Sequence, residues 1–352
     1  MTETPPPIRL ERCGYVGRIT LDTPRKLNAI DAAMAEAIMT ALEDWRHDPD
    51  VRRIVIDSSS ERAFCAGGDI KRLHTLVTAG EAKTAHHCMQ IPYRAMLMIA
   101  HYPKPVVTLM DGIAMGGGIG IGAHASHRVV TERSVLAMPE NIIGLTPDAG
   151  GSWLLACAPS THGLRYALTG ERMSGPLSVV MGFADTLISS HKLDAVRTAL
   201  ADCSAGEETS ILRDMSEPLS NATGDLFAAG SEDIYALGML DPHEGIPHLI
   251  DRLKGVAGKE GYDWATSDLD ALERACPFSL CVTWRMRQLL HSAAQSLDDA
   301  FAFETHAVGH LIARSDFAEG VRARVIDKDN SPHWSPSTIA NVNSAEVERC
   351  FS

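Results

Sequence analysis

The chain has 352 residues, and its 45 Asp and Glu exceed its 32 Lys and Arg, for a formal net charge of −13. A nucleic-acid partner is not expected, because phosphate neutralisation requires a basic face and none stands out. No apolar run approaches the roughly 18 residues of a membrane span. The first seven residues show neither a signal-peptide core nor an Arg-rich amphipathic pattern. We therefore expect a cytoplasmic protein without a membrane segment.

The first 200 residues alternate strand and helix patterns. Residues 16–21 and 53–57 are rich in β-branched side chains and predict strands. Between them, an Asp at position 31 followed by apolar residues at helical spacing predicts a helix to about residue 45. A long helical pattern covers residues 69–100, and residues 105–110 form an apolar run typical of a strand buried on both faces.

Composition changes near residue 201, where a polar stretch to residue 225 suggests a linker or surface excursion. Beyond it the pattern is helical: one helix opens at Pro277, a capping box of Ser296 and Asp299 begins the next, and a short helix starts at Ser344. We expect a strand-helix core over residues 1–205 and a mainly helical C-terminal region over residues 206–352.

Eight cysteines occur without any CxxC pair, so reduced thiols are expected. No metal site is predicted. The run His86-His87-Cys88 is a poor chelate, because adjacent helical residues point in different directions. His306 and His310 share a helix face but lack the acid of an HExxH motif.

Two glycine-bearing segments are candidates for a ligand site. Ala63-Phe64-Cys65-Ala66-Gly67-Gly68-Asp69 lies between a strand and a helix, and Met115-Gly116-Gly117-Gly118 follows the strand at 105–110. Glycines at such junctions expose backbone N–H groups and admit a ligand close to the main chain. If the loops converge, two N–H donors form an oxyanion hole; the alternative is two tight turns with no role in chemistry.

A competing interpretation of the second segment is a dinucleotide fingerprint. Residues 118–123 fit G-x-G-x-x-A, and Glu140 follows at about the expected distance. The spacing speaks against it, because the helix would have to end within about two turns and Glu140 follows a proline instead of a strand.

Two carboxylates, Glu140 and Asp148, each follow a proline in a segment that is otherwise apolar or rich in glycine. Apolar surroundings disfavour the charged form, which raises the pKa of a carboxyl toward values useful for general acid or base catalysis. The alternative is that they cap helices or turns. No G-x-S-x-G motif is present, so serine hydrolase chemistry is not expected.

Together these segments resemble the crotonase (enoyl-CoA hydratase/isomerase) superfamily over most of the chain. The resemblance rests on residues 24–30 (PRKLNAI), 63–69 (AFCAGGD), 115–118 (MGGG) and 138–140 (MPE). It implies an α/β fold, a crotonase-like spiral of ββα units with a C-terminal α-helical region that completes or covers the active site. It also implies that the N–H groups of Gly68 and Gly117 form the oxyanion hole, and that coenzyme A belongs to the substrate, so no separate cofactor is expected.

Within that superfamily the chain resembles the 3-hydroxyisobutyryl-CoA hydrolase branch. Hydratases carry a glutamate where this chain has Gly120, whereas Glu140 is retained and Asp148 replaces a glycine. Three C-terminal strings, at residues 276–280, 317–323 and 326–334, also resemble that branch. The resemblance implies hydrolysis of 3-hydroxyisobutyryl-CoA in valine catabolism. Glu140 would be the nucleophile or the general base, and Asp148 would orient the substrate or a water.

The resemblance also implies that Arg25, Lys26, Ala66 and Lys328 contact the CoA moiety. Trimers and hexamers are common in the superfamily, so a homo-oligomer is expected; the alternative is that the longer C-terminal helical region covers the active site of its own chain. Hydrolases of this branch tend to carry an acid on the helix before the third strand, where this chain reads QIPYR at residues 90–94. The acyl group therefore stays open. Two alternatives remain: a hydratase or isomerase that uses Glu140 alone, and a CoA-binding protein without catalysis.

Overall fold

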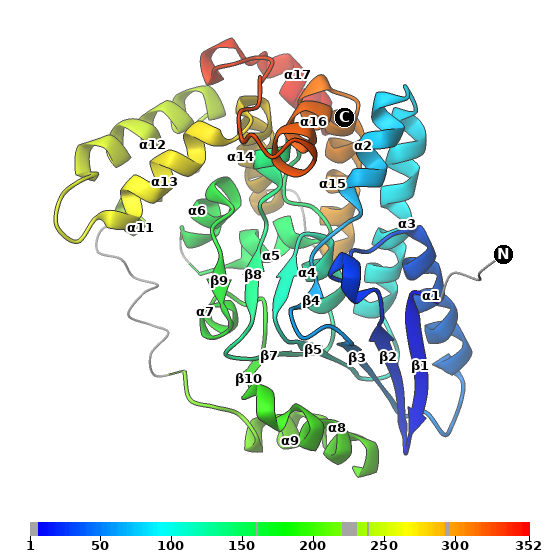
Figure 1. The fold of residues 1–352 in the computed structure, drawn as a ribbon. Helices are drawn as coiled ribbons and strands as arrows, with labels where there is room; N and C mark the ends of the chain where they lie inside the picture. The colour runs from blue at the N-terminus through cyan, green and yellow to red at the C-terminus, as the bar shows by residue number, and fades with distance from the viewer. Residues whose placement is uncertain (1–5, 160, 220–230, 238, 293–295) are drawn as a thin grey trace. The chain divides into compact units, whose positions relative to one another are not determined.

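The computed structural model describes residues 6–159, 161–219, 231–237, 239–292 and 296–352 (Figure 1). The chain forms two compact units, each built from segments that are separate in sequence. The first comprises Met1–Asp69, Met89–Ala137 and Met173–Ala222, and the second Ile70–Cys88, Met138–Arg172 and Thr223–Ser352. The division near residue 205 drawn from composition stays a prediction. No helix in the described part of the chain is long and apolar enough to cross a membrane.

The first unit contains two mixed sheets, one of six strands in the order β1-β2-β3-β5-β7-β10 and one of four in the order β4-β6-β8-β9. The strands are β1 (Ile8–Cys13), β2 (Val16–Leu21), β3 (Arg53–Ser58), β4 (Ala63–Cys65), β5 (Val106–Met110), β6 (Ile113–Met115), β7 (His127–Val130), β8 (Val135–Ala137), β9 (Met173–Ser174) and β10 (Thr186–Leu187).

A repeated two-strand step generates both sheets. In β3–β4, β5–β6 and β7–β8 the first strand joins the larger sheet and the second joins the smaller one, so β3, β5 and β7 are parallel neighbours, as are β4, β6 and β8. Each repeat therefore adds the next strand to both sheets, and the chain follows a spiral. Because β4 and β6 end side by side, the two glycine segments that follow them leave the same edge of the smaller sheet.

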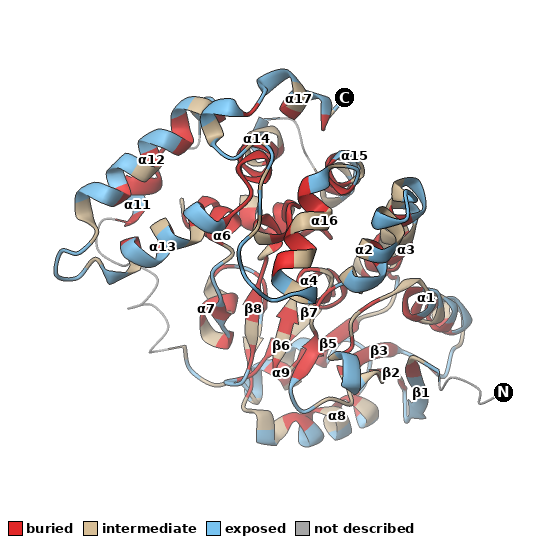
Figure 2. Ribbon diagram, turned by 45° about the horizontal axis from the view of Figure 1, so that its top comes forward, coloured by how far each residue is buried: buried red, intermediate tan, exposed pale blue. Residues whose placement is uncertain are grey.

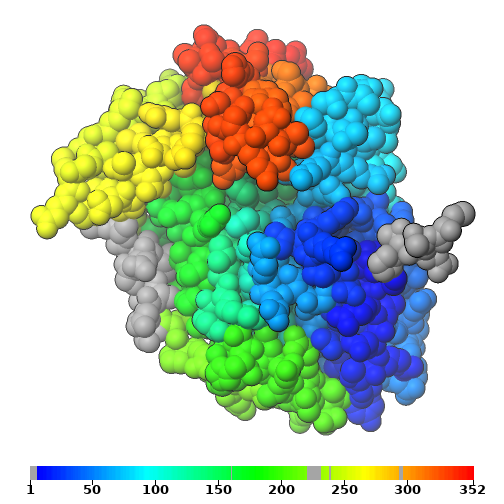
Figure 3. All heavy atoms as spheres, in the orientation of Figure 1, coloured from blue at the N-terminus to red at the C-terminus, as the bar shows by residue number. Residues whose placement is uncertain are grey.

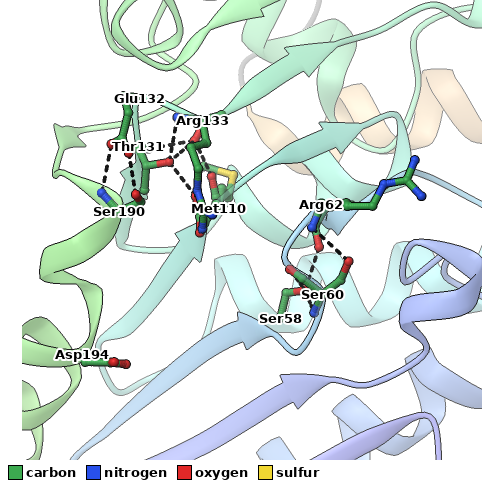
Figure 4. A network of polar contacts seen from close by, with 12 residues as sticks. Ser58, Ser60, Arg62, Met110, Thr131, Glu132, Arg133, Ser190 and Asp194 are labelled. Carbon is green, nitrogen blue, oxygen red and sulfur yellow. Dashed lines mark hydrogen bonds and ion pairs between the residues drawn. The ribbon is translucent and has the colours of Figure 1, made fainter.

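Short polar networks hold the turns at which the chain passes between the sheets (Figure 4). Between β3 and β4, the Ser58 hydroxyl donates to the Ala63 carbonyl (2.7 Å) and accepts from the Ser60 N–H. Between β7 and β8, the Ser134 hydroxyl accepts from the Thr131 N–H (2.7 Å). Hydroxyl side chains satisfy backbone groups that have no strand partner in such turns. These two turns therefore fix where β4 and β8 begin.

Helices cover the larger sheet on both faces. Val16, Val55 and Val107 point to the face that packs against α8 (Leu193–Asp202), where Val196 and Leu200 are fully buried. On the other face of β2, a Cβ at position 17 would lie 2.5 Å from the Trp45 ring of α1 (Ala32–Arg46), so only glycine fits there. The buried strands appear red in Figure 2. This α/β packing is the core of the first unit.

The remaining helices lie mostly in the second unit; α3 spans the boundary between the units, and α12 and α13 form the yellow surface in Figure 3. The helices are α2 (Ile70–Thr78), α3 (Ala82–Ala100), α4 (Gly117–Gly122), α5 (Gly151–Cys157), α6 (His162–Thr169), α7 (Gly175–Val180), α9 (Glu208–Asp214), α11 (Ser231–Tyr235), α12 (Pro242–Val256), α13 (Asp263–Arg274), α14 (Pro277–Ser292), α15 (Leu297–Ile312), α16 (Ser315–Val321) and α17 (Ser344–Arg349). Shorter helical turns are η1 (Pro24–Lys26), η2 (Glu140–Ile143), η3 (Ser190–Lys192), η4 (Arg322–Ile326) and η5 (Ile339–Asn341).

Most predicted elements are confirmed, including both caps. The Asp31 carboxylate accepts from the Met34 N–H (2.9 Å) at the start of α1, and the Ser296 hydroxyl accepts from the Asp299 N–H at the start of α15. The long helix predicted over residues 69–100 is wrong in one respect, because it is two helices. Gly80 adopts φ +82° and ends α2, a backbone conformation that favours glycine at helix C-termini.

The polar stretch at residues 201–225, expected to be a linker or a surface excursion, contains a helix. Glu208–Asp214 forms α9, and residues 220–225 lie outside the described part. The Arg53 guanidinium on β3 is fully buried, donates to Glu208 (2.7 Å) and to the carbonyls of Cys203 and Ser204, and so fixes this polar stretch against the sheet. Strand β1 was not predicted, because five of its six residues are exposed and it lacks a buried stripe.

The second unit contains a buried ion pair of its own. The Arg165 guanidinium on α6 donates two hydrogen bonds to Asp268 on α13 (2.7 and 3.0 Å), and the Tyr235 hydroxyl donates a third (2.8 Å). Asp268 is 1% exposed. A buried charge whose partner is removed is strongly destabilising, because its desolvation is no longer compensated.

Asp268→Asn is expected to lower the free energy of unfolding by about 3–5 kcal/mol, the usual cost of breaking a buried pair. Urea or thermal unfolding measures the change. The matched control is Asp270→Asn on the same helix, where the carboxylate pairs with Arg274 at the surface and is 60% exposed. Equal small losses for both variants would contradict a stabilising role for the Arg165–Asp268 pair.

Candidate active site

The first glycine segment pairs with the backbone at Ile30. The Ile30 N–H donates to the Gly67 carbonyl (2.8 Å), and the Asp69 N–H donates to the Ile30 carbonyl (3.0 Å), which makes a parallel bridge between Ile30 and Gly68. In such a bridge the middle residue turns its own N–H to the opposite side. The N–H of Gly68 is therefore directed away from Ile30, and it donates no backbone hydrogen bond among the described residues.

The second glycine segment lies against the first. The N–H of Gly117 is the first of α4, where it has no helical partner. A Cβ placed on Gly117 would lie 3.6 Å from the amide nitrogen of Gly68. Close packing is possible only because Gly118 has no side chain, since a Cβ there would lie 2.0 Å from the Cys65 carbonyl oxygen. The structure thus brings the two predicted donors together, with Gly68 exposed and Gly117 half-buried.

Asn28 holds the neighbouring segment in place, a role that the sequence did not assign. Its side chain is fully buried; it accepts from the Thr23 N–H (2.8 Å) and donates to the Ser58 hydroxyl (2.7 Å) and the Phe64 carbonyl (3.0 Å). Leu27 and Asn28 both have positive φ, a conformation in which Asn is enriched. The sequence signal for this role is weak: it is a single Asn in a segment for which no strand or helix is predicted.

The residues expected to contact CoA are distributed over both units. In the first unit, Arg25 and Lys26 are exposed in η1, and Lys26 pairs with Asp69 at 3.2 Å. Ala66 is half-buried, and its N–H donates to the Leu27 carbonyl (3.0 Å). In the second unit, Lys328 is exposed in the turn after η4.

The carboxyl segment belongs to the second unit. Glu140 is the first residue of η2 and is 7% exposed. Asn141 anchors this turn: its amide donates to the Ala167 carbonyl (2.7 Å), its side-chain oxygen accepts from the Thr283 hydroxyl (2.8 Å), and its carbonyl accepts from the Cys276 N–H (2.9 Å). Contacts with α6 and α14 therefore fix the position of the turn that carries Glu140.

Glu140 is held in an environment that disfavours its charge. Its Oε2 is buried and has no hydrogen-bond partner among the described residues. Burial first, and then the charges of Asp148 and Glu304, raise the pKa of Glu140 well above its usual value of 4.5. Asp148 is itself only 5% exposed. Glu140 and Asp148 therefore belong to one cluster of buried carboxyls in the second unit.

A third carboxyl, Glu304 on α15, was missed by the sequence analysis. It is fully buried and accepts hydrogen bonds from the N–H groups of Gly150 (2.7 Å) and Ser152 (3.2 Å) and from the Ser152 hydroxyl. Burial raises the pKa of Glu304 to about 8. A signal existed, because position 304 falls on the apolar stripe of α15 with Phe301 and Val308.

These features can polarise a carbonyl and move a proton. Two N–H donors directed at one oxygen stabilise an oxyanion, and a carboxyl with a raised pKa is suited to general acid or base catalysis. No cluster of His, Cys, Asp and Glu within the described ranges has the arrangement of a metal site. The fingerprint at residues 118–123 finds no support, because α4 is six residues long and Glu140 lies in a 3₁₀ turn instead of after a strand.

Comparison with known proteins identifies relatives of the whole chain. Residues 16–351 match the family described as enoyl-CoA hydratase/isomerase. The chicken mitochondrial 3-hydroxyisobutyryl-CoA hydrolase is 33% identical, over 99% of this chain and 90% of that protein.

Two solved structures show the same fold over nearly their full length. An enoyl-CoA hydratase from Rhodobacter sphaeroides is 35% identical with a TM-score of 0.86, covering 98% of this chain and 97% of that one. A carnitinyl-CoA dehydratase from Mycobacterium thermoresistibile is 31% identical with a TM-score of 0.85, covering 98% and 96%. The α/β spiral with a C-terminal helical region is thereby confirmed.

Proposed function

The chain belongs to the enoyl-CoA hydratase/isomerase family, and from that premise we propose that it hydrolyses an acyl-CoA thioester, 3-hydroxyisobutyryl-CoA, to 3-hydroxyisobutyrate and CoA. One observation carries the choice of hydrolysis: Glu140 and Asp148 form a buried carboxyl pair, whereas Gly120 stands where hydratases carry their other glutamate. Syn-addition of water to a double bond uses two carboxylates that flank it, and Gly120 offers none.

The glycine loops supply the electrophilic part of this mechanism. A thioester carbonyl oxygen gains charge as its carbon is attacked, and the N–H groups of Gly68 and Gly117 would donate to it. Loss of one such donor typically costs about 2.7–4 kcal/mol of transition-state stabilisation. Within the described residues, neither the Gly68 N–H nor the Gly117 N–H donates a backbone hydrogen bond, so both can donate to the thioester oxygen.

The carboxyl pair supplies the rest. In one route the Glu140 carboxylate would attack the carbonyl carbon, form an anhydride and expel CoA thiolate, and a water would then cleave the anhydride to release the acid and restore the carboxylate. In the other route Glu140 would take a proton from a water that attacks the thioester directly, and the first attack forms an oxyanion on the same carbonyl oxygen in both routes. Asp148 would orient the substrate hydroxyl or the water and assist proton transfer to the thiolate. Glu140 lies three residues after Ala137 in the sequence. The Ala137 carbonyl accepts a hydrogen bond from the N–H of Gly116, in the second glycine segment.

The chicken relative carries the name of this activity, while the two solved structures carry the names of a hydratase and a dehydratase at similar identity. A hydratase that uses Glu140 alone is therefore the second candidate. The positions expected to recognise the acyl hydroxyl read Gln90 to Arg94 in α3, without an acid, so the acyl group is varied in the test of this proposal.

The test is thiol release, followed with a disulfide reporter, from 3-hydroxyisobutyryl-CoA and crotonyl-CoA in parallel. The proposal predicts rapid release from the hydroxyacyl thioester and no loss of crotonyl absorbance. Loss of crotonyl absorbance without free thiol would establish the hydratase instead. Release from other short acyl thioesters but not from the hydroxyacyl one would retain hydrolysis and change the substrate.

A further inference from the structure

The turn between Asp148 and α5 has an unusual backbone. Ala149 adopts φ +57° and Gly150 φ +75°, so two consecutive residues are left-handed. For a residue with a Cβ this conformation costs roughly 1–2 kcal/mol. Such a turn persists only when surrounding interactions hold it. Because Asp148 directly precedes it, the turn helps to set the direction of the Asp148 side chain.

Glu304 is the group that holds this turn. Its Oε2 accepts from the N–H of Gly150 (2.7 Å), the second residue of the left-handed pair. Its Oε1 accepts from the Ser152 N–H (3.2 Å) and from the Ser152 hydroxyl. These are N–H groups at the start of α5, which has no side-chain cap of its own. A side chain from a helix 154 residues further along the chain therefore performs the capping.

We propose that Glu304 is a positioning residue for the Glu140–Asp148 pair, which it serves by fixing the Asp148–Ser152 turn and by placing a third carboxyl beside the pair. This inference rests on the proposed function of Glu140 and Asp148. It goes beyond that function because Glu304 lies on α15 and acts on the reaction only through the other two carboxyls.

The charged groups around Glu304 support an electrostatic effect on the pair. Besides burial, the charge of Asp148 raises the pKa of Glu304, and the charge of Glu304 raises the pKa of Glu140. On α14, Arg287 lines the same small cavity as Ser152, but its Nε has no hydrogen-bond partner among the described residues and it pairs with no carboxylate there. On α16, Asp316 pairs with Arg314. The His86 ring contacts the carbonyl of the next residue on α15, Thr305, at 3.0 Å. Glu304 thus faces carboxyls and lacks a cationic partner in the described structure.

The first test is Glu304→Gln, which keeps the shape and one acceptor oxygen but turns an amide NH₂ toward one of the donors at Gly150 and Ser152. We expect kcat to fall by about 10- to 100-fold with KM little changed, because small displacements of catalytic groups have effects of this size. Glu273→Gln, an exposed site on α13, is the matched control and should match wild type.

A second readout separates positioning from a merely structural role. Where Glu304 is ionised it opposes the ionisation of Glu140, so Glu304→Gln should shift to lower pH the part of the Glu140 titration that lies near or above the Glu304 pKa of about 8, and with it the acidic limb of kcat/KM. The Glu140 carboxyl can be followed directly by carbon NMR of glutamate-labelled free protein, assigned with Glu140→Gln. This titration needs no substrate, so it tests the inference even if the enzyme acts on another thioester.

An unchanged Glu140 titration together with kcat within twofold of wild type would overturn the proposal. If Glu304→Gln does not fold, Ser152→Ala takes its place, since it removes one of the three donors and leaves both backbone N–H groups. The proposal then predicts a severalfold lower kcat at constant KM, and an unchanged kcat would refute it.

Discussion

Replacing Glu140 by Gln is expected to lower kcat for thioester hydrolysis by about 10²- to 10⁴-fold, the range for loss of a general acid or base. The amide has nearly the same shape but offers neither a nucleophilic oxygen nor a basic one. Substrate binding should be largely retained, because the oxyanion donors belong to the Gly68 and Gly117 backbone. Steady-state thiol release and equilibrium binding of a CoA thioester measure the two effects separately.

The same variant has a predictable effect on stability. Burial raises the pKa of Glu140, so the folded state holds this proton more tightly than the unfolded state. Wild type therefore loses stability as pH rises from the usual value of 4.5 through the raised pKa. Glu140→Gln removes that loss, so its free energy of unfolding relative to wild type should increase with pH.

Urea unfolding of both proteins at several pH values measures this difference. Glu36→Gln, at an exposed position on α1, is the control and should alter neither activity nor the pH dependence. A Glu140→Gln enzyme that retains wild-type turnover would exclude Glu140 as nucleophile or base.

Removal of one oxyanion donor is the second large effect. Gly68→Pro deletes the N–H that is directed away from Ile30, and we expect kcat to fall by about 10²- to 10³-fold. A Cβ at this position meets nothing within 4 Å, and Gly68 does not have the positive φ that proline cannot adopt. Single-turnover thiol release at saturating thioester measures the effect.

Gly68→Ala is the matched control, because it adds the same Cβ but keeps the N–H. Activity near that of wild type for Ala with a large loss for Pro assigns the effect to the donor. Gly117→Pro checks the second donor at the first position of α4, where proline is favoured in helices. Equal losses for Pro and Ala at position 68 would mean that loop shape matters and the N–H does not.

Local patterns were sufficient for most elements of the fold. The capping Asp31 and the strand at residues 106–110 depend on neighbours in sequence, so spacing alone predicted them. The break at Gly80 was missed because a single glycine inside a helical pattern does not reveal its φ. The exposed strand β1 was missed because it exists through pairing with β2, which no local pattern records.

The sequence by itself determined the chemistry available to this protein: glycines where backbone N–H groups are exposed, two carboxyls after prolines, and a resemblance that named the family. Tertiary structure decided which of these groups meet. The bridge at Ile30 directs the Gly68 N–H, the missing side chain of Gly118 lets α4 approach β4, and Glu304 reaches the Asp148 turn from α15. Burial decided the electrostatics as well, because the pKa of a carboxyl depends on the atoms packed around it, and those come from distant segments of the chain.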